Sequence, residues 1–381
     1  MSTLKTWLTR VVLVGASLFI AIVLVELILR LVPGLLPPGF GVEAARTQIV
    51  NDNEFSFYEY HPVLGWKGAP GAAGTLITTE SETEVRFNSA GLRDDEYDLA
   101  KPDGVTRIAV LGDSFAWGYG VEQDENFAAA LETQLNEAGH AVEVLNFGLT
   151  GYGTDQDYLA YLELARAYEP DIVILAFYEN DVLEVANLQM YGYPKPFFLL
   201  EDGELVLANT PIAEPQDWLA TREFGPSALG GAGTLKNRVY SNVASIHLVR
   251  FVLGKWKLAT QTKDAYSQNA DAWPKTQALI SALNEEATDD GAQMVVLLIP
   301  TQWEILRVQP WAFELDDLIA FVEAEHPDVP VVDPRPALRH PDEGTAAEMY
   351  FEFNGSHWTA AGHALIADLL YDTLLDEGFI R

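Results

Sequence analysis

The sequence contains no cysteine among its 381 residues. This absence excludes a structural disulfide, a thiolate nucleophile and a metal centre with cysteine ligands. It does not identify the compartment, because an exported protein can fold without disulfides.

Positive charge is also scarce. Lys and Arg together number 23 against 56 Asp and Glu, which gives a formal net charge of −33. Such a surface repels phosphate backbones, so we expect no nucleic-acid partner. A solvated acidic surface is the simplest interpretation of the excess. The sequence has neither a His-Glu-x-x-His pattern nor a phosphate-binding loop, so we expect no metal and no cofactor.

A long apolar stretch runs from Val11 to Val32, and only Glu26 and Arg30 interrupt it. As a helix, these residues span about 33 Å, which matches the hydrocarbon core of a bilayer. We therefore predict a transmembrane anchor over residues 11–32, in contact with the lipid bilayer. Glu26 and Arg30 are four residues apart, so they share a helix face and can pair.

Basic residues precede this stretch. Lys5 and Arg10 lie within residues 1–10, and the positive-inside rule predicts that this tail is cytoplasmic. The chain is then a single-pass protein of the inner (cell) membrane, with its bulk periplasmic or extracellular. A cleavable signal peptide is the alternative, because a charged start and an apolar run fit both. The length of the run favours the uncleaved anchor.

From Arg107 onward, apolar runs alternate with amphipathic segments. Runs of this kind are typical of parallel strands that are buried on both faces. The alternation predicts an α/β fold, in which a central parallel sheet lies between two helical layers in a three-layer α/β/α arrangement. We expect strands at residues 107–112, 142–147, 171–177, 294–299 and 329–332, and helices at 126–138, 154–168, 275–289, 315–325 and 359–375.

The domain boundaries follow from where this alternation of strands and helices begins and where it is interrupted. Residues 33–103 are interpreted as a linker and short-strand lead-in, and residues 104–381 as the main domain. An insertion interrupts the domain at about residues 185–273, with a hairpin around Glu201-Asp-Gly-Glu204 and a helix at about 239–258.

Four short motifs follow strands or begin a helix. In such a sheet, ligands bind beyond the carboxyl ends of the strands, so we expect the motifs to meet there. A serine needs an adjacent base to become nucleophilic at neutral pH, and histidine is the usual base. Donors aimed at the developing oxyanion are also required. Each motif alone fits an ordinary turn or helix cap, and only the combination indicates a site. The motifs are Gly112-Asp113-Ser114-Phe115, Asn146-Phe-Gly148-Leu-Thr-Gly151, Asn180-Asp181 and Asn354-Gly-Ser-His357-Trp358.

In their order along the chain, these motifs resemble the SGNH subset of GDSL esterases and lipases, over about residues 84–375. The segment Phe87-Asn-Ser-Ala-Gly-Leu-Arg93 and the end of the anchor also resemble bacterial, membrane-anchored members. The resemblance implies the flavodoxin-like SGNH hydrolase fold.

For the site, the resemblance implies that Ser114 is the nucleophile and His357 its general base. It also implies an oxyanion hole formed by the backbone N–H groups of Ser114 and Gly151 and by the Asn180 amide. Asp113, Asp181 and Gly148 are expected in supporting positions. Tyr178 stands where the family often has glycine.

The chain departs from the family pattern at Asn354, where an aspartate usually precedes the histidine. An Asn oxygen can accept from the histidine ring and hold it, but it cannot supply negative charge to the imidazolium. Glu352 or Asp333 could take that role in space. A weakened enzyme, a Ser-His dyad and a pseudoenzyme all remain open.

We therefore expect an extracytoplasmic serine ester hydrolase that removes acyl or acetyl groups from a carbohydrate through an acyl-enzyme on Ser114. One alternative is an O-acyltransferase that modifies a surface glycan, with a membrane acyltransferase as its partner. Another is a catalytically impaired binding or assembly protein with the same fold.

Overall fold

A computed structural model describes residues 2–32, 57–78, 80–190, 193–214, 243–245, 248–249, 271–305, 315–339, 346–351 and 357–380. The chain divides into two compact units. One comprises residues 1–51 and 225–261, and the other comprises residues 52–224 and 262–381. The helix expected at 239–258 lies largely outside the described residues.

The first unit contains helix α1, Ser2–Leu31. Its segment Leu13–Leu31 has a mean hydropathy of 2.3 and is long and apolar enough to be a membrane span or a signal sequence. The expected pair within it is present, with Arg30 Nη2 lying 2.7 Å from Glu26 Oε1. The Glu26 carboxylate also accepts hydrogen bonds from the backbone N–H groups of Ala244 and Ser245. These bonds hold that short segment against α1.

The second unit is built on a five-stranded parallel sheet with the strand order β13-β12-β7-β5-β6. The interior residues of β5, β7 and β12 are buried. Burial of successive residues is what a sheet covered on both faces requires, because their side chains alternate between the faces. The strands are β5 (Thr106–Gly112), β6 (Val142–Asn146), β7 (Ile172–Tyr178), β12 (Gln293–Ile299) and β13 (Val331–Val332).

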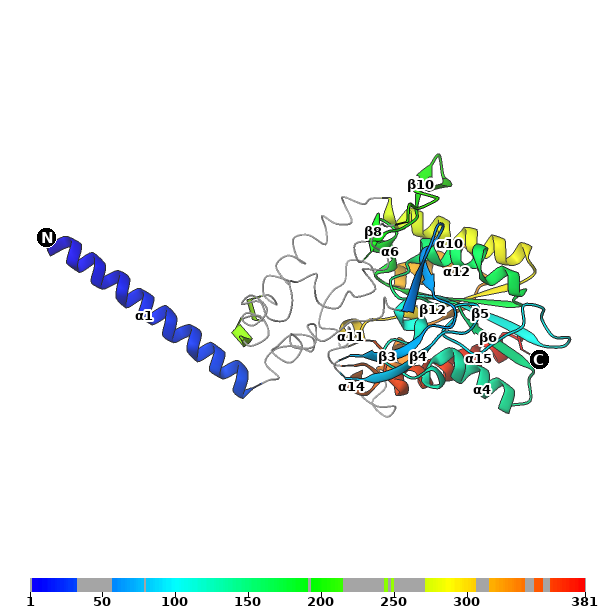
Figure 1. The fold of residues 1–381 in the computed structure, drawn as a ribbon, viewed down its shortest axis with the longest axis horizontal. Coiled ribbons are helices and arrows are strands. Elements are labelled where there is room, and N and C mark those ends of the chain that lie inside the picture. The colour runs from blue at the N-terminus through cyan, green and yellow to red at the C-terminus, as the bar shows by residue number, and fades with distance from the viewer. Residues whose placement is uncertain are drawn as a thin grey trace. The chain divides into compact units, whose positions relative to one another are not determined.

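Helices cover both faces of this sheet, and Figure 1 shows α4 and α15 on the side opposite α10. Ile108 and Val110 of β5 belong to the apolar core that α4 (Phe127–Glu137) and α15 (Ala360–Asp376) complete. Ala109 and Leu111 face the other way. They belong to the core formed with α5 (Thr154–Glu163), α10 (Ala272–Asp289) and α12 (Leu315–Glu325). The predicted three-layer α/β/α architecture is confirmed.

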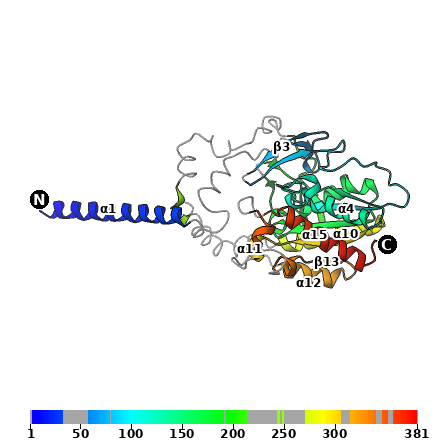
Figure 2. The same cartoon turned by 90° about the horizontal axis from the view of Figure 1, so that it is seen from below.

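Short hairpins precede and interrupt this core. In Figure 2 the β3–β4 hairpin lies on the side of the unit away from α12 and β13. The predicted hairpin around Glu201–Glu204 is present as β10 and β11, with Asp202 and Gly203 at positive φ in its turn. The hairpin strands are β1 (Tyr58–His61), β2 (Gly65–Gly68), β3 (Ala73–Ile77), β4 (Glu82–Arg86), β8 (Gln189–Met190), β9 (Tyr193–Pro194), β10 (Phe197–Glu201) and β11 (Glu204–Ala208).

The helix expected over residues 154–168 is interrupted. The α-helix α5 ends at Glu163, and a 3₁₀ helix, η4, follows at Ala165–Tyr168. Leu164 between them has φ −125° and ψ −60°, and Glu169 then adopts a φ of 52°. These two residues turn the chain sharply into β7, so regular helical geometry cannot continue to residue 168.

Candidate active site

Ser114 and His357 are hydrogen-bonded partners. Ser114 Oγ lies 2.7 Å from His357 Nε2, across 243 positions of sequence. Both side chains are partly buried. For Ser114 to donate in this bond, the proton of the neutral imidazole must sit on Nδ1. The structure therefore brings together the serine and the histidine that the sequence analysis paired.

Ser114 is positioned by the turn that follows β5. It is the first residue of the short helix α3, Ser114–Trp117, and Asp113 caps that helix by accepting a hydrogen bond from the Phe115 N–H. Burial raises the pKa of the Asp113 carboxyl to about 7. Its buried side chain faces the protein interior. Asp113 thus supports the turn and does not belong to the hydrogen bond between Ser114 and His357.

His357 is held by a two-residue bridge just before α15. Tyr350 and Trp358 form an isolated antiparallel bridge, and the Phe351 N–H donates to the His357 carbonyl at 2.8 Å. Trp358 is fully buried and packs edge-on against Phe115. Because the residue next to the histidine is locked in the core, the His357 backbone is fixed opposite Ser114.

Two backbone N–H groups at the site have no acceptor within the described part of the chain, those of Ser114 and Gly151. Gly151 has a φ of 75°, which glycine adopts without strain. The Asn180 Nδ2 donates to Glu184 Oε1 at 2.7 Å, and an amide nitrogen carries a second hydrogen. Two backbone N–H groups and one amide hydrogen at this edge of the sheet thus have no acceptor among the described residues.

The other sequence-predicted residues support this edge of the sheet. Gly148 packs tightly on α3, since a Cβ there would lie 2.5 Å from the Ala116 Cβ. Asp181 lies buried at the start of α6 (Asp181–Glu184) and faces Thr154, not Ser114. Burial raises the pKa of its carboxyl far above the usual range.

The partner expected for the second nitrogen of the His357 ring lies beyond what the structure describes. Asn354 and Glu352 both fall outside the described residues. Asp333 is described, and its carboxylate accepts from the Arg335 side chain at 2.8 Å through each oxygen. Its hydrogen bonds are thus directed to Arg335. Among the described residues, no group of three or more His, Asp or Glu side chains is arranged to hold a metal ion.

The sequence of residues 110–365 matches the model of the GDSL-like Lipase/Acylhydrolase family. The chain belongs to this family. The match covers two thirds of the chain and includes Ser114, Gly151, Asn180 and His357.

Three solved structures are similar to this chain over most of their own length. TesA is 14% identical with a TM-score of 0.40, and the alignment covers 71% of this chain and 99% of that one. The lipase/acylhydrolase from Enterococcus faecalis is 14% identical with a TM-score of 0.39 and coverage of 72% and 97%. A family 3 carbohydrate esterase from Clostridium thermocellum is 14% identical with a TM-score of 0.39 and coverage of 71% and 96%. No curated protein matches the sequence.

Within this GDSL-like site, the structure adds a residue to which sequence analysis assigned no role. Arg93 is buried and donates to three backbone carbonyls that follow Ser114, those of Trp117, Gly118 and Val121, at 2.6 to 3.1 Å. Its guanidinium also lies 4.4 Å from the centroid of the Trp117 ring. Burial lowers the pKa of Arg93 to about 10, so it stays charged at neutral pH. Arg93 thus supplies hydrogen-bond donors to backbone carbonyls at the C-terminal end of α3 and in the turn that follows it.

Asp94, the residue after Arg93, binds the end of β6 and the loop that follows it. Asp94 Oδ2 accepts from the Asn146 N–H at 2.8 Å, and the Asn146 amide donates to the Ala116 carbonyl at 2.7 Å. Asn146 Oδ1 in turn accepts from the Gly148 N–H. The lead-in segment therefore fixes both the loop that carries Ser114 and the loop that follows β6.

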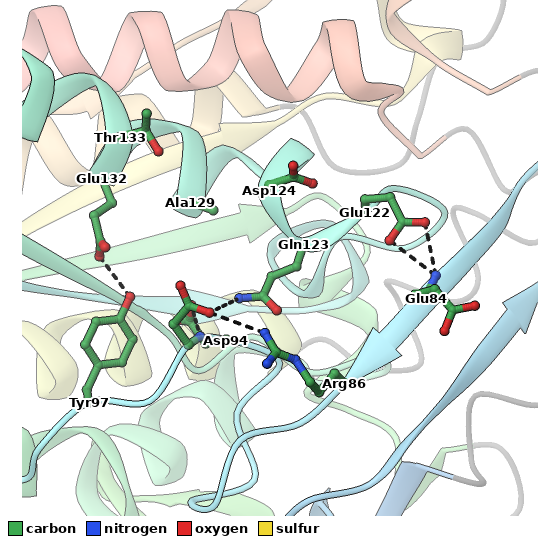
Figure 3. Close-up of a pocket in the computed structure, with 11 residues that line it drawn as sticks. Glu84, Arg86, Asp94, Tyr97, Glu122, Gln123, Asp124, Ala129, Glu132 and Thr133 are labelled. Carbon is green, nitrogen blue, oxygen red and sulfur yellow. Dashed lines mark hydrogen bonds and ion pairs between the residues drawn. The ribbon is translucent and has the colours of Figure 1, made fainter.

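A pocket of about 390 Å³ lies behind this network, and neither Ser114 nor His357 lines it. Figure 3 shows that Tyr97 and Glu132 point toward each other across it, joined by a 2.9 Å hydrogen bond. Asp94 also reaches this pocket, and burial raises the pKa of its carboxyl to about 8. The lining is mostly acidic, with Arg86 as its one basic residue. The pocket is distinct from the Ser114–His357 pair.

Proposed function

We propose that the chain is a serine ester hydrolase that works through an acyl-enzyme on Ser114. The observation that carries this proposal is the 2.7 Å hydrogen bond between Ser114 Oγ and His357 Nε2, beside N–H groups that have no acceptor in the described chain. A positioned base and positioned oxyanion donors are the two requirements of serine acylation.

In the acylation step, Ser114 Oγ forms a bond to the ester carbonyl carbon while its proton passes to His357 Nε2. The Ser114 and Gly151 N–H groups and the second Asn180 amide hydrogen stabilise the oxyanion. The carbon–oxygen bond to the alcohol then breaks, and His357 returns the proton to the leaving alcohol. In the second half, water forms a bond to the acyl carbon while its proton passes to His357 Nε2. The bond between the acyl carbon and Ser114 Oγ then breaks, and His357 returns the proton to Oγ as the acid leaves.

Labelling of Ser114 by a fluorophosphonate probe tests the proposal most directly. The full chain in detergent is treated with the probe, and intact mass and peptide mapping locate the adduct. We expect one adduct, on Ser114, and none in Ser114→Ala. If the folded parent protein stays unlabelled, the alternative of a non-catalytic binding or assembly protein is correct.

We further propose that the substrate is an acyl or acetyl ester of a carbohydrate outside the cytoplasm, with the chain tethered to the membrane through α1. The support is the resemblance to anchored bacterial members and the length and hydropathy of Leu13–Leu31. Incubation with an acetylated oligosaccharide should release acetate. If an unacetylated oligosaccharide, supplied with an acyl donor, becomes acylated faster than acetate is released, the protein is an O-acyltransferase.

A further inference from the structure

The imidazole of His357 lies against two aromatic rings. The Phe115 ring centroid is 4.7 Å from that of His357 at an interplanar angle of 32°, and the Tyr119 centroid is 4.7 Å away at 31°. Both rings belong to the segment that follows Ser114.

Tyr119 is held in this place by the backbone. The helix α3 ends at Gly118, which has a φ of 86°, and the Tyr119 N–H then donates to the Ser114 carbonyl at 3.0 Å. A Cβ on Gly118 would lie 2.5 Å from the Asn126 Nδ2, so neither the conformation nor the space admits a side chain. Arg93 fixes the Gly118 carbonyl at 2.6 Å. The turn at Gly118 thus holds Tyr119 close to α3, the short helix that begins with Ser114.

Aromatic faces carry partial negative charge and attract a cation within about 6 Å of the ring centroid. His357 becomes a cation when it takes the proton of Ser114. In a site with a carboxylate behind the histidine, that carboxylate stabilises the imidazolium. This chain has Asn354 at the corresponding position, and an amide carries no charge. Aromatic rings this close to the imidazole are a further source of stabilisation for its cationic form.

We propose that Tyr119, together with Phe115, is a positioning residue for His357. The rings fix the plane of the imidazole so that Nε2 points at Ser114 Oγ, and their faces stabilise the imidazolium. This inference rests on the proposed function, because it assigns a role to Tyr119 in the acylation of Ser114.

Two substitutions separate the ring from the hydroxyl. Tyr119→Phe keeps the aromatic face, and Tyr119→Leu keeps apolar bulk without it. With p-nitrophenyl acetate as substrate, we expect Tyr119→Phe to retain the parent kcat within about twofold. Tyr119→Leu should lower kcat about tenfold with little change in KM. Equal kcat for Tyr119→Leu and the parent, or an equal loss in both variants, would overturn the proposal.

A graded substitution isolates the electrostatic contribution. Replacing Tyr119 by phenylalanine with one, two and three ring fluorines keeps the shape of the ring while weakening its negative face. We expect kcat to fall with each fluorine, starting from the Tyr119→Phe value. A flat series shows that the rings do not stabilise the imidazolium. This series remains decisive if Tyr119→Leu fails to fold, because the packing is preserved.

A measurement that requires no catalytic turnover separates the role of Tyr119 from the proposed ester hydrolase function. If the parent neither turns over ester nor reacts with fluorophosphonate, the proposed function fails. The contact of the Tyr119 ring with His357 is then tested by NMR of the His357 ring protons in the full chain. Flanking aromatic faces shift these protons upfield, and Tyr119→Leu should remove part of that shift while Tyr119→Phe keeps it. An unchanged shift in Tyr119→Leu contradicts the contact itself.

Discussion

Lys195 and Asp155 form an ion pair that is completely buried, with Lys195 Nζ lying 2.8 Å from Asp155 Oδ1 and neither side chain exposed. Asp155 lies in the first turn of α5, and Lys195 comes from the predicted insertion. Lys195 Nζ also donates to the Glu184 carbonyl at 3.0 Å. One cation therefore ties the beginning of the insertion to the helices beneath the candidate site.

Removing this cation should destabilise the second unit strongly. Lys195→Met leaves the Asp155 carboxylate buried without its partner, and the loss of one partner of a buried pair costs about 3–5 kcal/mol. Lys67→Met is the matched control. Lys67 pairs with Glu59 at 2.8 Å where both side chains are partly exposed, so its loss should cost less than about 1 kcal/mol. Urea unfolding followed by circular dichroism measures both, and equal costs would contradict the assignment.

Buried carboxyls at the same edge of the sheet as Ser114 predict that the stability of the fold decreases as pH rises. Burial raises the pKa of Glu179 and Glu184 to about 8 and that of Asp113 to about 7, against 3.8 to 4.5 for the exposed groups. Between about pH 4 and pH 8, the folded protein thus holds protons that the unfolded chain has released. Folding stability then decreases with pH, because the folded state binds more protons.

The buried side chain of His363 has the opposite effect on stability, but only at lower pH. Burial lowers the pKa of His363 to about 3 from 6.5, so its contribution to stability grows from pH 3 to pH 6.5 and is constant above. The decline should therefore be clearest between pH 6.5 and pH 8. Urea midpoints at constant ionic strength test this, and Glu184→Gln should flatten the slope. A midpoint that rises over this interval refutes the prediction.

Arg93 should prove irreplaceable by lysine. The guanidinium satisfies three carbonyls and faces the Trp117 ring, whereas an ammonium group cannot reproduce this planar set of donors. Arg93→Lys leaves buried carbonyls unpaired, so we expect a loss of about 2 kcal/mol in unfolding free energy and a slower reaction of Ser114 with fluorophosphonate. Arg86→Lys is the control, because Arg86 is largely exposed and pairs with Asp95 at only 3.4 Å. Equal effects of the two substitutions would contradict the role of Arg93.

The strands and helices of the core could be predicted because their signal is local. The expected strand at 107–112 is observed as Thr106–Gly112, and the helix expected at 315–325 is observed as Leu315–Glu325. In the helix, burial repeats at Leu315, Leu318 and Val322, and in the strand every residue after Thr106 is buried. Both apolar patterns therefore show directly in the sequence. The strand expected at 329–332 is shorter and spans only Val331–Val332. This strand, β13, is at the edge of the sheet, and its length depends on where the chain meets β12, which is a matter of tertiary context.

The surroundings of the site could not be predicted in the same way. Ser114 and His357 were paired through the motif order, but the acceptors of Arg93 are backbone carbonyls, and every residue carries a carbonyl. The ring of Tyr119 reaches His357 only because Gly118 reverses the chain. The Gly-Tyr-Gly sequence at 118–120 hints at a special turn, yet nothing local indicates which distant ring it meets.

Restoring the family's acidic residue by Asn354→Asp should raise esterase turnover. A carboxylate that accepts from the Nδ1 hydrogen of His357 would stabilise the imidazolium electrostatically, in addition to orienting the ring. In a serine protease, the opposite change from Asp to Asn lowers turnover about 10⁴-fold while the geometry is kept. We expect a smaller gain here, because the Phe115 and Tyr119 rings already stabilise the imidazolium. Asn354→Asp should therefore raise the kcat for p-nitrophenyl acetate by a larger factor in the Tyr119→Leu background than in the parent protein. A fall in kcat on Asn354→Asp would mean that another residue orients His357.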